Sequence, residues 1–72
     1  LKALEIYEKV VEIDPNDAEA WEWIGKINRF FLDDYETALK AFKKAYELTN
    51  APEYLANVRE IELLMKSEGE SR

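Results

Sequence analysis

The sequence predicts an all-α fold in which antiparallel helical hairpins stack as a short solenoid of about four helices. Apolar residues recur at three- and four-residue spacing along almost the whole chain, which is the period of an amphipathic helix. One apolar pattern also occurs twice, 35 residues apart. Its two copies are Ala3, Leu4, Tyr7, Val10 and Ile13, and then Ala38, Leu39, Phe42, Ala45 and Leu48. A fixed period of this length is typical of repeat proteins, whose units bury their apolar faces against their neighbours.

The first predicted helix covers residues 1–13 and ends before Pro15. Proline disfavours helical geometry at the residue that precedes it, so Asp14 is expected to lie outside the helix. Asn16 is then expected to cap a second helix, with Glu19 at the third position of a capping box.

The second predicted helix covers residues 17–31 and carries two apolar stripes. One side carries Ala20, Trp21, Ile24, Gly25, Phe31 and the polar Asn28, and the additional stripe comprises Trp23, Ile27 and Phe30. So wide an apolar surface predicts a helix packed between two others. In the turn that follows, Asp33 is the expected cap of the third helix, with Glu36 in the box position.

The third predicted helix, residues 34–48, repeats the first, and Pro52 is expected in the first turn of a fourth helix that covers residues 52–66. Residues 67–72 are polar and predict a flexible tail. Because all the connections are short, consecutive helices should run antiparallel.

Composition limits the classes of function. The chain has 72 residues, a net charge of −6 and neither cysteine nor histidine, so the usual thiol nucleophile, general base and soft metal ligands are missing. We therefore expect no catalytic residues, no metal and no cofactor. Its many charges and lack of a long apolar run predict no membrane span, and we expect a cytoplasmic protein. The acidic balance disfavours nucleic acid and favours a basic or mixed peptide.

Several of these residues resemble the signature of the tetratricopeptide repeat family. Trp21, Ile24 and Gly25 are similar to its first helix, and Ala38, Phe42 and Ala45 are similar to its second. The resemblance implies that residues 1–66 form a helical repeat domain. It comprises the second helix of a preceding repeat (1–13), one full repeat (17–48) and a capping helix (52–66).

The chain departs from the family pattern at three positions. Asn28 stands where the family usually has an aromatic ring, and Phe30 or Phe31 is expected to supply the missing bulk. Arg59 and Glu62 stand in the fourth helix where Gly25 and Asn28 stand in the second. A charge cannot be buried without a partner, so the fourth helix is expected to cap the stack.

In proteins of this family, first helices line a groove that binds an extended peptide or a partner helix, and scaffolding is the usual role. The resemblance places the following residues in such a groove: Glu19, Glu22, Trp23, Lys26, Arg29, Phe30, Glu53, Asn57 and Glu60. Trp23 and Phe30 would form an apolar platform, with Lys26 and Arg29 beside it as cationic donors. Trp23 is equally compatible with a place in the core, against a neighbouring helix.

Two alternatives remain open. The first helix has no hairpin partner, so its apolar residues predict a homo-oligomer formed through that helix. Helical-repeat RNA binders also have periods near 35 residues, but their grooves are basic, whereas this groove is acidic.

Overall fold

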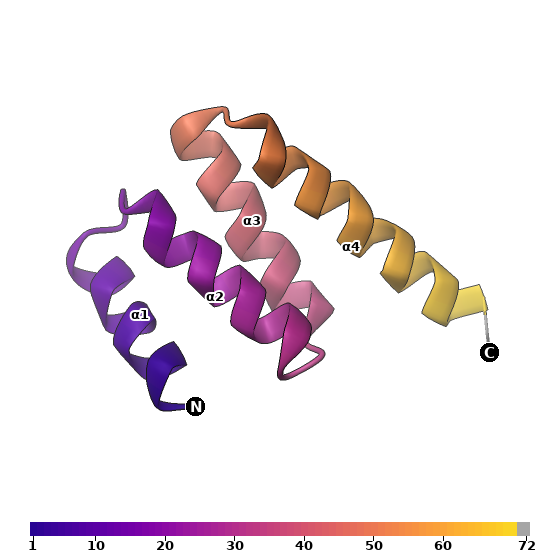
Figure 1. The fold of residues 1–72 in the computed structure, drawn as a ribbon, viewed down its shortest axis with the longest axis horizontal. Coiled ribbons are helices and arrows are strands. Elements are labelled where there is room, and N and C mark those ends of the chain that lie inside the picture. Colours follow the sequence, from indigo (N-terminus) through magenta and orange to yellow (C-terminus); the bar gives the residue numbers. More distant parts are fainter. Residues whose placement is uncertain (71–72) are drawn as a thin grey trace.

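The computed structural model describes residues 1–70, with the backbone alone for residues 69 and 70. Its helices are α1 (Lys2–Ile13), α2 (Ala18–Phe30), α3 (Tyr35–Thr49) and α4 (Pro52–Glu70), as Figure 1 shows. Each helix packs mainly on its neighbours in the sequence, and α1 and α4 lie at opposite ends of the row. No strand occurs within the described residues, so the predicted all-α class with four helices is confirmed. Within the same residues, no helix is both long and apolar enough to cross a bilayer.

The cap of α2 is Asp17, so the prediction of Asn16 is wrong. The carboxylate of Asp17 accepts a hydrogen bond of 3.1 Å from the backbone N–H of Ala20. The backbone N–H of Asn16 instead donates to the Asp14 carboxylate, at 3.1 Å. The indole N–H of Trp21 donates to the Pro15 carbonyl at 2.8 Å, which ties the loop to the helix. These bonds begin the helix one residue later than the sequence predicts.

A similar shift by one residue occurs before α3, where the cap is Asp34 and the prediction of Asp33 is wrong. Asp34 accepts hydrogen bonds from the backbone N–H and the hydroxyl of Thr37, at 3.2 Å and 2.7 Å. These bonds stabilise the ionised form and lower the pKa of Asp34 below its ordinary value of 3.8. Asp33 turns the chain with a φ of 52°. Glu36 faces Lys40 across one helical turn, at 3.8 Å.

The α3 helix ends at Thr49, and its C-cap is Asn50, whose φ of 57° places it in the left-handed region that often terminates helices. Pro52 is the first residue of α4, as predicted. The helix then continues past residue 66, where the sequence predicts the start of a tail, to Glu70; residues 71–72 lie outside the described range. The C-terminal turns of α4 extend beyond the other helices (Figure 1).

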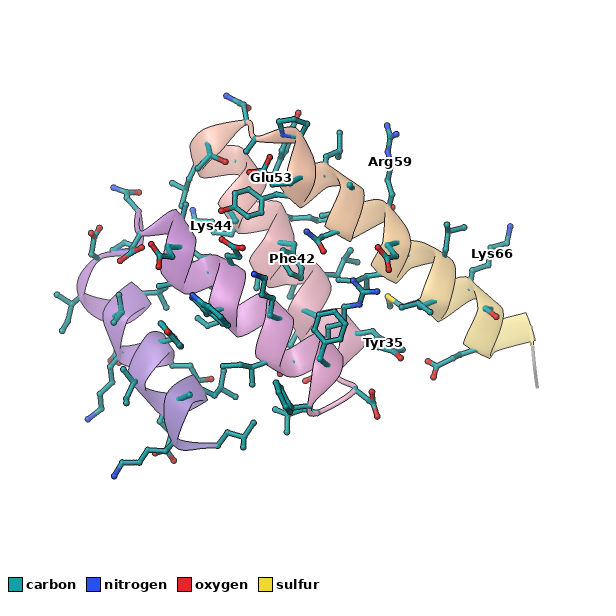
Figure 2. All side chains as sticks on the ribbon, viewed as in Figure 1. Tyr35, Phe42, Lys44, Glu53, Arg59 and Lys66 are labelled. Carbon is teal, nitrogen blue, oxygen red and sulfur yellow. The ribbon has the colours of Figure 1, made fainter. Side chains whose placement is uncertain are left out.

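The core forms where α3 lies between α2 and α4. The Phe42 side chain is completely buried, and in Figure 2 it lies between the ribbons of α2 and α4. The buried cluster around it joins small residues of α3 to larger ones of α4: Ala38, Ala45, Tyr54, Val58 and Ile61. Gly25 of α2 lies directly against the Phe42 ring. The short side chains allow α3 to approach both neighbours closely.

Asn28 is buried within α2. Neither Phe30 nor Phe31 supplies the bulk of the aromatic ring that the family usually has at this position. The side-chain amide of Asn28 donates a 2.8 Å hydrogen bond to the carbonyl of Ile24, which satisfies the buried N–H. Phe30 and Phe31 are 61% and 73% exposed, so the prediction that one of them fills the space is wrong. Phe30 is the last residue of α2 and Phe31 is its C-cap.

Candidate functional site

The residues predicted to line a binding groove lie on one side of α2 and α4. We call this surface the α2–α4 face; it comprises Glu19, Glu22, Trp23, Lys26, Arg29, Phe30, Glu53, Asn57 and Glu60. All of them keep some exposure to solvent. Side-chain contacts join the two helices across this face in two places.

The first contact joins Tyr54 of α4 to Glu22 of α2. The Tyr54 hydroxyl donates a 2.8 Å hydrogen bond to Glu22 Oε1, and Lys26 Nζ lies 2.9 Å from Glu22 Oε2. Partial burial opposes ionisation of Glu22, but the hydrogen bonds from Lys26 and Tyr54 and the charge of Lys26 outweigh it, so its pKa lies below 4.5. Burial, the bond to Glu22 and nearby acidic charges raise the pKa of Tyr54 to about 12. Glu22 therefore stays ionised and Tyr54 neutral at physiological pH.

The second contact is an ion pair between Arg29 of α2 and Glu60 of α4. The guanidinium of Arg29 also lies 4.6 Å from the centre of the Phe30 ring. Only 11% of the Arg29 side chain is exposed, whereas Glu60 is 59% exposed. Both predicted cationic donors are therefore already engaged within the molecule, Lys26 by Glu22 and Arg29 by Glu60.

Trp23 lies at the edge of the α2–α4 face that is nearest to α1. Its ring stacks on that of Tyr7, with the centroids 6.0 Å apart and the planes 10° from parallel. The ammonium of Lys26 lies 4.8 Å from the centre of the Trp23 ring, and 39% of the residue stays exposed. Trp23 thus combines both sequence interpretations, since it packs on a neighbouring helix and still presents apolar surface to solvent.

Two acidic groups of the face have no ion-pair partner among residues 1–68, whose side chains the structure describes. They are Glu19 and Glu53, both exposed, and both close enough to raise the pKa of Tyr54 through their charge. The side-chain amide of Asn57 is committed to its own helix, where it donates to the Glu53 carbonyl at 2.8 Å. The charge left uncompensated on the α2–α4 face is therefore negative.

Sequence reasoning missed two residues of this arrangement, Tyr7 and Tyr54. Both belong to apolar helical patterns, which predict core positions for them, and Tyr54 is indeed buried. The available signal was chemical, because a buried tyrosine hydroxyl needs a hydrogen-bond partner. Nothing in the spacing identifies Glu22 as that partner, since the two residues are 32 positions apart.

The comparison with known families agrees with this architecture. The sequence model of the tetratricopeptide repeat family matches residues 6–40, from within α1 to the first half of α3. No curated protein and no solved structure matches the chain significantly.

Residues 6–40 thus match a tetratricopeptide repeat, the family whose signature the sequence motifs resemble. Repeats of this family are typically non-enzymatic modules of protein interaction.

Proposed function

We propose that this protein binds a basic or mixed peptide, or a partner helix, along the α2–α4 face, and that it serves as a scaffold or adaptor. The observation that carries the proposal is the charge balance of that face. Lys26 and Arg29 are each neutralised by a glutamate, which leaves Glu19 and Glu53 to attract a cationic ligand. The half-exposed Trp23 ring beside them offers an apolar anchor.

The contacts within the molecule favour a basic ligand over an acidic one. A ligand carboxylate would have to displace Glu22 from Lys26 or Glu60 from Arg29, and would then lie beside the freed glutamate. A lysine or arginine side chain can reach the exposed carboxylates of Glu19 and Glu53 without breaking either pair. Complementary charge of this kind adds mainly to specificity and to the association rate.

Selection from a phage-displayed library of random peptides tests the proposal. The double variant Trp23→Ala/Glu53→Lys serves as the counter-selection, since both changes lie at exposed positions. We expect selected peptides to carry a net positive charge, and a synthetic copy to lose at least about tenfold in affinity on Trp23→Ala, which is roughly 1.4 kcal/mol. Peptides that are acidic, or that bind Trp23→Ala, Glu22→Lys and wild type equally, would show that the face is not the site.

We also infer self-association through α1 as a second function. The observation that favours it is the comparison of α1 with α3, which occupies the equivalent place in the repeat. Ile6 is 55% exposed whereas its counterpart Ala41 is 1% exposed, and Ile13 is 87% exposed whereas its counterpart Leu48 is half-buried. Sedimentation velocity over a concentration series tests this inference, and a strictly monomeric chain would refute it.

A further inference from the structure

Both end helices of the row leave an apolar stripe uncovered. In α1 the stripe comprises Ala3, Ile6, Val10 and Ile13, and we call it the outer stripe of α1. Tyr7, which adjoins this stripe, stacks on Trp23 of α2, and Ala3 lies near Ile27 and Phe31 at the end of α2, so Ile6 and Ile13 are the most outward residues of the stripe. No residue of α1 is buried, which sets it apart from α2 and α3.

The outer stripe of α4 comprises Pro52, Ala56, Arg59 and Leu63. These residues, together with Leu55 and Glu60, line a shallow pocket of about 440 Å³ on the side of α4 away from the core. Leu63 is 67% exposed, and Arg59 points away from the other helices (Figure 2). Both end helices therefore present apolar surface that no described part of the same molecule covers.

The charges beside the two stripes are complementary. Lys2 and Lys9 lie seven residues apart along one edge of the α1 stripe, and Glu53 and Glu60 lie seven residues apart along one edge of the α4 stripe. Residues seven apart lie on the same side of a helix, two turns from each other. When the two helices run parallel, both lysines can therefore meet both glutamates in one register, with Val10 placed against Ala56 and with Glu60 shared between Lys9 of the second copy and Arg29 of its own.

We propose that the outer stripe of α1 in one copy packs in parallel on the outer stripe of α4 in a second copy. This inference rests on the self-association function proposed above and identifies the surface on which α1 docks. The two surfaces differ, so the contact is heterologous and leaves one free α1 and one free α4 on every pair. Further copies add head to tail, and the rotation between copies decides whether the product is a ring or an open chain.

The same charges disfavour pairing of α1 with itself in the antiparallel sense. In an antiparallel pair, corresponding edges of the two helices adjoin, so Lys2 and Lys9 would lie beside the lysines of the other copy. The contact with α4 replaces this repulsion by attraction.

The contact is looser than the packing of α3 on α2. Arg59 stands where α2 has Gly25, the position at which the Phe42 ring approaches most closely. A helix on α4 must remain far enough away to accommodate the Arg59 stem. Association is therefore weak, and it depends on ionic strength because the charge pairs lie at the exposed edge.

Two variants test the two sides of the contact, α1 and α4, separately. Ile6→Arg places a charge in the outer stripe of α1, and Ala56→Arg places one in that of α4. Both positions are exposed, so we expect each variant to fold, and circular dichroism is the control for this. We expect the wild-type mass to rise with concentration from about 10 µM to about 1 mM, where a weak contact becomes populated. We expect each variant alone to remain monomeric.

An equimolar mixture of the two variants gives the decisive result. Ala56→Arg keeps a working α1 and Ile6→Arg keeps a working α4, so the mixture should form 1:1 dimers and nothing longer. A mixture that stays monomeric would overturn the head-to-tail contact. If Ala56→Arg alone still associates but Ile6→Arg does not, self-association through α1 stands and its docking on α4 is refuted. A wild-type chain that is monomeric at every concentration refutes both.

Discussion

The ring of Phe42 on α3 lies so close to Gly25 on α2 that a methyl group on the glycine would be 2.7 Å from Cε2 of the ring. Phe42 is completely buried in the cluster that joins α3 to α4, so the ring cannot withdraw without disturbing both interfaces. The crossing of α2 and α3 therefore depends on the absence of a side chain at position 25.

Gly25→Ala should destabilise the fold by about 1–3 kcal/mol, the usual cost of overpacking a core. The direction of the change in the free energy of unfolding tests the close approach, because in an exposed helix the same substitution stabilises by up to about 1 kcal/mol. Urea unfolding followed by circular dichroism measures the effect. The matched control is Gly25→Ala in a Phe42→Leu background, where the smaller side chain should relieve part of the cost. A stabilising effect in the wild-type background would contradict the close approach.

Tyr54→Phe should destabilise the fold by about 1–2 kcal/mol at neutral pH, because it removes the hydrogen bond to the Glu22 carboxylate. Tyr46→Phe is the matched control, since the Tyr46 hydroxyl forms no hydrogen bond with another described residue. Equal effects of the two changes on the free energy of unfolding would show that the bond to Glu22 contributes nothing.

The same pair predicts how stability depends on pH. The pKa of Glu22 is lower in the folded state, so its contribution is present above about pH 4.5 and is lost as the pH falls through the folded value. The pKa of Tyr54 rises from 10.0 to about 12 on folding, so its contribution is complete below pH 10 and is lost between there and pH 12. Unfolding in urea at a series of pH values should show both losses. Tyr54→Phe should reduce the loss of stability between pH 10 and pH 12. If that loss is the same in the variant and the wild type, it does not come from Tyr54.

The two neighbouring aspartates before α3 should respond in opposite ways. Asp34→Ala removes the cap and should cost about 0.5–2 kcal/mol. Asp33→Gly should be neutral or slightly stabilising, because glycine adopts a φ of 52° without the strain of a side chain. Thermal unfolding distinguishes the two variants. A loss of stability in Asp33→Gly with none in Asp34→Ala would mean that Asp33 is the cap after all.

The caps show where sequence reasoning reaches its limit. Three residues able to cap a helix, Asp14, Asn16 and Asp17, lie within four positions before α2. Periodicity and proline show that a boundary lies there, but only the path of the chain decides which side chain meets a free N–H. The pair Asp33 and Asp34 presents the same ambiguity, so both predicted caps are one residue early.

The helices themselves were predictable because their apolar spacing depends on local sequence alone. Tertiary partners were not predictable in the same way. The sequence places Lys26 and Arg29 among candidate ligand contacts, and the structure shows both engaged by glutamates, one of them on another helix. Such pairs depend on how helices meet in space, and that information is not contained in the spacing of one helix.

The most direct test of the α2–α4 face as a peptide site uses the two tryptophans of the chain. The Trp21 indole N–H is held by the Pro15 carbonyl, whereas Trp23 is half-exposed on the face. In a ¹⁵N-labelled protein each gives a separate indole signal, and the library-selected basic peptide is the titrant. We predict that the Trp23 signal shifts to saturation while the Trp21 signal remains in place. A peptide that binds without moving the Trp23 signal would contradict the proposed function.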